Sequence, residues 1–93
     1  INAITAPTTI GTVTRTSGAL TATDGDTVSY TFSNDGNATN VQYALASSEG
    51  ADVVNGLDVT FNVVGTSTIT VTATSAGSSD SPDVTTFDVV VSA

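Results

Sequence analysis

The chain has no histidine, cysteine or lysine, and its one basic residue is Arg15. Without cysteine it forms no disulfide and holds no cysteine-ligated zinc or iron–sulfur site. Serine and threonine are plentiful, but their hydroxyls become nucleophiles only beside a base, and neither histidine nor lysine is present to act as one. The sequence therefore predicts that the protein is not an enzyme and has no catalytic residues.

Positive charge is almost missing. Nine acidic residues face one basic residue, which gives a formal net charge of −8 and a pI near 4.1, although only 11% of the residues are charged. The negative electrostatic field of such a chain repels the phosphates of nucleic acids and of anionic membrane surfaces. No apolar run approaches the roughly 20 residues that span a bilayer. We expect neither nucleic-acid binding nor membrane insertion, and we interpret the acidic surface mainly as an aid to solubility.

Methionine is absent as well, and the chain starts at Ile1. Because a primary translation product begins with methionine, we expect a processed form or a piece of a longer protein. The 93 residues are enough for one domain and too few for two, so residues 1–93 are assigned to a single domain. Residues 1–7 are expected to be a lead-in strand or linker, since Pro7 is unsuited to central pairing.

Alternation of polar and apolar residues dominates what is present. In the segment Gly65–Thr74 the even positions from 66 onward carry threonine, and the odd positions hold Ser67, Ile69, Val71 and Ala73. A period of two predicts a strand with one solvent-exposed face and one face that packs in the core. Similar alternation recurs in the ranges 27–32, 41–45, 57–63 and 87–91. The pattern predicts an all-β fold, an antiparallel β-sandwich of seven to eight strands, with a closed barrel as the competing architecture.

The first quarter of the chain is less regular. Ile10 and Val13 fall out of phase around Gly11, which predicts a bulge at that glycine within a weak strand over residues 8–15. Residues 19–23 are expected to finish the same edge strand.

Two further details concern turns and register in the second half. The dipeptide Asn55-Gly56 predicts a tight β-hairpin. Val84 is out of phase with the apolar residues of the last strand, which predicts a bulge near Thr85-Thr86.

Three segments resemble the bacterial immunoglobulin-like pattern. The stretch 41–49 reads Val-Gln-Tyr-Ala-Leu-Ala-Ser-Ser-Glu, the turn Asn55-Gly56 follows, and 65–73 reads Gly-Thr-Ser-Thr-Ile-Thr-Val-Thr-Ala. In that family an aromatic-Ser-Ser strand precedes a turn glycine and a Gly-Thr-x-x-Ile-Thr-Val-Thr-Ala strand. The stretch 25–32 is similar to the second strand of the related polycystic-kidney-disease-type domains. The likeness covers roughly residues 25–92, and Tyr43 stands where the family usually has tryptophan.

This resemblance implies an immunoglobulin-like β-sandwich that is non-catalytic and serves as a surface module. We favour a virion structural protein, such as a capsid decoration or tail domain of a bacteriophage. The alternative is an immunoglobulin-like repeat of a bacterial cell-surface adhesin or scaffold protein. A carbohydrate-binding accessory domain is third, and it would require exposed aromatic residues.

The same resemblance sets the expected location and partners. The module would lie on the virion surface, or outside the cell on the bacterial surface. Its partners would be capsid or tail proteins, neighbouring surface modules or a cell-surface glycan, and homo-oligomers would arise through assembly.

Calcium is the one cofactor that the sequence brings into question. Hard cations bind clustered oxygen ligands, and an immunoglobulin-like strand order brings the polar loops 34–37 and 78–83 to one end. The residues that would converge as calcium ligands are Asp35, Asn37, Asp80 and Asp83. The alternative is that they form turns without a metal, because Asp and Asn are ordinary turn formers and their spacing does not match a calcium-binding loop with its glutamate at position twelve.

The hydroxyl side of the segment Gly65–Thr74 is the remaining functional candidate. Thr66, Thr68, Thr70 and Thr72 share one face and can satisfy the polar groups of another protein without burying charge. We interpret them as a candidate partner-binding surface. A solvated outer face is the alternative, since threonine is a common exposed strand residue.

The five aromatic residues fall in core register rather than on the polar face. They are Tyr30, Phe32, Tyr43, Phe61 and Phe87. Aromatic side chains in this register pack in the core far more often than they stack on a ligand, so we predict a packing role for all five.

Overall fold

The computed structural model describes residues 7–93. In that range the chain forms nine β-strands and no helix, which confirms the all-β prediction. The strands are β1 Val13–Ser17, β2 Thr21–Thr23, β3 Thr27–Ser29, β4 Thr31–Asn34, β5 Gln42–Ser47, β6 Val53–Asn55, β7 Asp58–Thr60, β8 Gly65–Thr74 and β9 Asp83–Ser92. The count exceeds seven or eight in part because Tyr30 divides one expected strand into β3 and β4. Of the expected lead-in segment 1–7 only Pro7 is among the described residues, and it is exposed and outside any strand.

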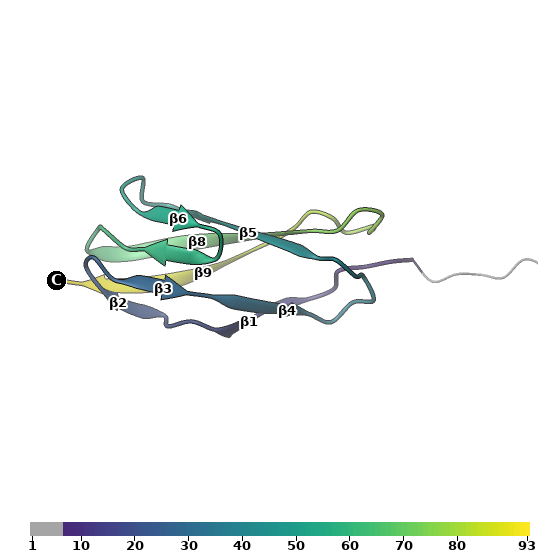
Figure 1. Ribbon diagram of the computed structural model, residues 1–93, viewed down its shortest axis with the longest axis horizontal. Coiled ribbons are helices and arrows are strands. Elements are labelled where there is room, and N and C mark those ends of the chain that lie inside the picture. Colours follow the sequence, from purple (N-terminus) through teal and green to yellow (C-terminus); the bar gives the residue numbers. More distant parts are fainter. Residues whose placement is uncertain (1–6) are drawn as a thin grey trace, which may run out of the picture.

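Backbone pairing groups the strands into layers. β2, β9, β8 and β5 form one four-stranded sheet in that order, and the remaining strands form the pair β1–β4 and the sheet β3–β7–β6. The pairing of β2 with β9 is parallel, and the other pairs are antiparallel. In Figure 1 the strands β3 and β6 are nearer to the viewer than the paler β8 and β9. The arrangement is therefore sandwich-like, with apolar side chains between the layers.

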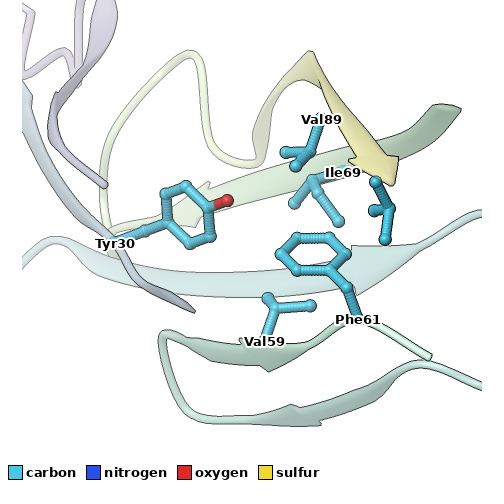
Figure 2. Packing of buried hydrophobic residues seen from close by; sticks show 6 residues of the cluster. Tyr30, Val59, Phe61, Ile69 and Val89 are labelled. Atoms are coloured by element: carbon cyan, nitrogen blue, oxygen red, sulfur yellow. The ribbon is translucent and has the colours of Figure 1, made fainter. Parts of the chain in front are cut away.

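Six buried side chains form the main core. They are Tyr30, Val59, Phe61, Ile69, Val89 and Val91, each at most 2% exposed. The first three come from the layer that contains β3 and β7, and the last three come from β8 and β9 (Figure 2). The alternation predicted for Gly65–Thr74 is confirmed, because all four of its odd-numbered side chains from 67 to 73 are buried.

The aromatic residues extend this core in a row. Ring centroids are 5.0 Å apart for Tyr30 and Phe87, 6.2 Å for Phe87 and Phe32, and 5.5 Å for Phe32 and Tyr43. Burial raises the pKa of Tyr30 to about 12, against a smaller opposing effect of Arg15. The predicted packing role is confirmed for Tyr30 and Phe61, which are buried, and for Phe32 and Phe87, which are half-buried and pack against the core. Tyr43 is half-buried as well and contacts the ring of Phe32.

The N-terminal strands differ from the expectation. No strand covers Gly11, whose φ is 80°, and the register shift lies between Arg15 and Ser17 instead, so the bulge predicted at Gly11 is wrong. Nor does β2 finish the edge strand begun by β1, because it pairs with β9 in the other sheet. Between the two strands the chain passes through Gly18, whose φ of 112° is readily adopted only by glycine.

The predicted hairpin is confirmed. Asn55 pairs with Asp58, which leaves a two-residue connection between β6 and β7. Gly56 is the first residue of this connection and has a φ of 62°, which glycine adopts without steric cost.

The bulge predicted near Thr85-Thr86 is wrong. The ladder between β8 and β9 runs without a register shift from Gly65 to Ala73. Val84 is out of phase because it points outward, with 56% of its surface exposed. Val84 is thus an apolar residue of the outer face, and its position needs no bulge.

Candidate functional site: the acidic end and the threonine face

The loop between β8 and β9 carries Asp80, one of the four predicted calcium ligands. Its carboxylate accepts hydrogen bonds from the N–H groups of Ile10, at 2.8 Å to Oδ1, and Gly11, at 3.0 Å to Oδ2. These two bonds hold the pKa of Asp80 below its usual range, because they stabilise the ionised form. The carboxylate thus fixes a segment that lies 69 or 70 residues earlier in the chain.

The loop between β4 and β5 binds the same segment from another side. Asp35 Oδ1 accepts a bond of 2.6 Å from the N–H of Thr12, and Asn37 Oδ1 accepts one of 2.8 Å from the N–H of Thr9. The Asn37 amide also donates to the carbonyl of Pro7 at 3.4 Å. Three of the four predicted ligands are therefore gathered at one end, on one irregular stretch of backbone.

Backbone pairing completes this arrangement. The N–H groups of Gly36, Ala38 and Ser79 donate to the carbonyls of Ile10, Thr9 and Thr8, at 2.8, 2.9 and 2.9 Å. The side chain of Ile10 is fully buried at the centre. We call the segment Thr8–Thr12, together with loop residues 35–38 and 79–80, the N-terminal clamp.

Close contact in the clamp depends on glycine. A Cβ on Gly36 would lie 2.2 Å from the carbonyl oxygen of Thr9, and one on Gly11 would lie 2.5 Å from the backbone nitrogen of Gly36. Real Cβ atoms essentially never come this near to backbone atoms. The β4–β5 loop and the N-terminal segment therefore approach each other this closely only because both positions lack a side chain.

The arrangement of the acidic residues bears on the predicted calcium site. Asp83 begins β9 opposite Ala73, and its side chain is half-buried. Among the described residues no group of three or more acidic, histidine or cysteine side chains is placed to hold a metal ion. Both carboxylate oxygens of Asp80 and Oδ1 of Asp35 already accept N–H bonds. The role seen for these side chains is to bind backbone, and the calcium site stays a prediction.

The predicted partner-binding threonines lie along the outer face of β8. Thr66 is exposed, whereas Thr68, Thr70 and Thr72 are half-buried, because strands on both sides crowd them. β5 places Ala46 and Ala44 opposite Thr70 and Thr72. β9 places Thr86 and Val84 opposite the same two threonines. We call this outer surface of β5, β8 and β9 the threonine face.

The threonine face is nearly free of charge. Among the outward residues of these three strands, all of which the structure describes, Asp88 is the one charged residue, and its Oδ1 accepts a bond of 2.9 Å from the hydroxyl of Thr68. Val84 and Val90 are 56% and 54% exposed on the same face. A chain of net charge −8 thus presents one broad surface of hydroxyl and methyl groups.

Sequence reasoning missed several members of both sites. Ile10 is the buried apolar residue at the centre of the clamp. The sequence indicated it only as a single isoleucine among polar residues and glycine. Ala44 and Ala46 belong to the threonine face. The sequence indicated them only as two small residues that alternate with larger ones in one strand. Neither sequence pattern shows which residues these side chains lie beside, because their neighbours on adjacent strands or loops are distant in the sequence.

Comparison with known proteins yields no relative. A scan against protein-family models found no matching family, and searches of curated proteins and of solved structures found no match either. No pocket is found in residues 7–93, and that part of the chain contains no helix long and apolar enough to cross a membrane.

Proposed function

We propose that this chain is an immunoglobulin-like β-sandwich that acts as a non-catalytic structural module on a surface. The strand order supports the proposal. The order β1–β4 with β3–β7–β6 corresponds to sheet A-B-E-D of an immunoglobulin domain, and β5–β8–β9 corresponds to C-F-G. In this correspondence β1 and β2 are two separate strands, one at the edge of each sheet.

The setting that we propose first is a virion, in which the module is a capsid decoration or tail domain of a bacteriophage. The single observation that carries this proposal is the threonine face. A face with one charge can lie against another protein without burying unpaired charges, which is a large cost at interfaces. Its hydroxyls supply donors and acceptors for the partner.

The alternative setting is an adhesin or scaffold of the bacterial cell surface, and a different observation supports it. In Figure 1 the dark purple N-terminal segment and the C-terminus lie at opposite ends of the molecule. Modules with this geometry can be joined head to tail. The N-terminal clamp would then fix the angle at which the preceding chain arrives. A carbohydrate-binding role has less support, because Tyr30 and Phe61 are buried and offer no stacking surface.

Immunogold electron microscopy distinguishes the two settings. An antibody raised against the chain is applied to phage particles and to cells of the source culture. Label on virions supports the capsid or tail assignment, and label on cell envelopes supports the adhesin. Label on neither surface contradicts the proposed function.

A binding experiment then tests the threonine face on whichever surface is labelled. Thr70→Glu places a charge at the centre of the face and is expected to abolish rebinding of the purified chain to that surface. Thr14→Glu adds the same charge at an exposed position of β1, in the other layer, and should rebind like the wild type. Equal binding of both variants would show that the threonine face is not the docking surface.

A further inference from the structure

The edge strands of this molecule are not equally protected against pairing with another chain. β1 carries Arg15 and a register shift between Arg15 and Ser17. β2 and β6 have three residues each and are flanked by Asp24 and Asp52. Charge, irregularity and shortness are the usual devices that prevent edge-to-edge association. β3 and β4 are also edges of their sheets, and they have three and four residues and are flanked by Asp26 and Asp35. Each of these five edges therefore carries such a device.

β5 is the remaining edge, and no such device lies within the strand. It has six residues, and its register with β8 is unbroken from Gln42 to Ser47. No charged residue, proline or glycine occurs in the range 38–48. In the described part of the chain β8 is the one strand that pairs with it. A straight, neutral strand with a free side is a template for another strand.

The backbone of β5 shows which groups face the free side. The N–H of Ser48, directly after the strand, donates to the carbonyl of Thr68 on β8 at 2.9 Å. In an antiparallel pair the backbone groups of successive residues point alternately toward and away from the partner strand. The N–H and C=O groups of Tyr43, Leu45 and Ser47 therefore point away from β8, toward the open edge.

We propose that the β5 edge pairs antiparallel with β5 of a second copy of this chain, forming a two-fold symmetric dimer. With Ala44 on the two-fold axis, the edge groups of Tyr43 meet those of Leu45 in the partner. Gln42 then lies opposite Ala46 on the outer face. Two copies of the β2–β9–β8–β5 sheet become one eight-stranded sheet.

Charge and side-chain size favour a second copy as the partner. Each copy carries a net charge of −8, so two copies associate best where few acids lie, and none of the six residues of β5 is charged. The nearest acid seen is Asp52, whose Oδ2 accepts a bond of 2.6 Å from the hydroxyl of Ser47 at the end of the strand. Residues on the axis belong to a pair without hydrogen bonds, in which the side chains approach most closely, and Ala44 is small enough to fit. The two threonine faces join into one neutral surface.

Sedimentation equilibrium on the 93-residue chain tests the proposal. We expect a monomer–dimer equilibrium that shifts toward the dimer as NaCl is raised from about 0.01 M to about 0.5 M, because salt screens the repulsion between the copies. Ala44→Lys and Ala44→Glu each place like charges opposite each other across the interface and are expected to weaken dimerisation at least ~10-fold. An equimolar mixture of the two variants should restore the dimer as a heterodimer.

Controls locate the interface. Thr14→Lys adds a charge at an exposed position of β1, in the other layer and away from the β5 edge, and should dimerise like the wild type. Circular dichroism and thermal unfolding of each variant establish that it is folded. A wild type that stays monomeric at about 1 mM in high salt overturns the proposal. A dimer that persists in both Ala44 variants, or that is lost in Thr14→Lys, also overturns it. The same holds if mixing the two Ala44 variants does not restore the dimer.

Discussion

At the scale of single residues, side chains that bind backbone determine the acidic end of the molecule. Asp80, Asp35 and Asn37 all accept hydrogen bonds from N–H groups of residues 9–12. The sequence was sufficient to predict that two oxygen-rich loops meet. It was not sufficient to predict what the oxygens bind, because almost every residue has a backbone N–H group and composition does not show which of them need a partner.

Asp80→Asn tests this role. An amide oxygen accepts from one N–H, but the amide nitrogen cannot accept the second bond, so Ile10 or Gly11 loses its partner and Tm at pH 7 falls. The folded-state pKa of Asp80 lies below its unfolded value of about 3.9. Its stabilisation is therefore complete above that value and is lost as the pH falls through the folded-state pKa. Unfolding measured from about pH 6 to about pH 2 should show a shallower loss of stability in the variant.

The control for this experiment is Asp58→Asn, at an exposed position of β7. It removes one negative charge without touching the clamp, so its acid profile should follow that of the wild type. An Asp80→Asn profile as steep as the wild-type profile would show that the two N–H bonds add nothing to stability.

Ser67 is a polar residue placed in the core by the alternation of β8. It is fully buried, and its hydroxyl has no hydrogen-bond partner among the described residues. Burying an unpaired hydroxyl costs about 1–3 kcal/mol, so we expect Ser67→Ala to raise the free energy of unfolding by about 1 kcal/mol. Denaturant unfolding measures the gain. Ser29→Ala, at an exposed position of β3, should change little, and a destabilised Ser67→Ala would imply a partner for the hydroxyl.

At the scale of elements, some strands can be predicted from their own residues, whereas the pairing of others depends on residues far away in the sequence. The bounds and faces of β8 follow from its own alternation, and the β6–β7 hairpin follows from a glycine at its turn. The sheet to which β2 belongs does not follow from its sequence, because its partner β9 lies some 70 residues away and nothing in the residues 21–23 specifies it. For the same reason the N-terminal clamp could not be predicted as an element.

Gly36→Ala tests whether the clamp is a stabilising element. The added methyl group would lie 2.2 Å from the Thr9 carbonyl oxygen, so backbone must move, and overpacking of this kind costs roughly 1–3 kcal/mol. Gly50→Ala is the matched control, because its Cβ would meet nothing within 4 Å. Urea unfolding compares the two variants. Equal stability would show that the Thr8–Thr12 segment is readily displaced from the loops.

Phe61→Ala tests the packing of the layers on each other. Phe61 is fully buried between them, and removing a buried phenyl ring costs roughly 3–5 kcal/mol, a large part of the stability of a domain this small. Denaturant unfolding should give a loss in that range. Val64→Ala, at a position 53% exposed, should cost far less. A loss below about 1 kcal/mol for Phe61→Ala would mean that its neighbours close the cavity or that its face is wrongly assigned.

At the scale of the whole molecule, the distribution of charge matters more than its sum. Composition predicts a strong negative field from nine acids and one base. It does not predict that two acids bind the N-terminal segment while the threonine face and β5 are almost free of charge, because strand pairing decides which residues share a surface. The neutral surfaces are where the contacts proposed above are concentrated.

Salt and calcium separate general repulsion from a specific metal site. Raising NaCl shortens the Debye length from about 30 Å at 0.01 M to about 8 Å at 0.15 M, so repulsion among the carboxylates weakens and Tm rises. At equal ionic strength we expect the same Tm in CaCl₂ and MgCl₂, because three carboxylate oxygens at the acidic end already accept N–H bonds. A ligand at a hundred times its Kd stabilises by about 2.7 kcal/mol, which thermal unfolding detects easily. A higher Tm in calcium that disappears in Asp83→Asn would instead establish the site at Asp35, Asn37, Asp80 and Asp83.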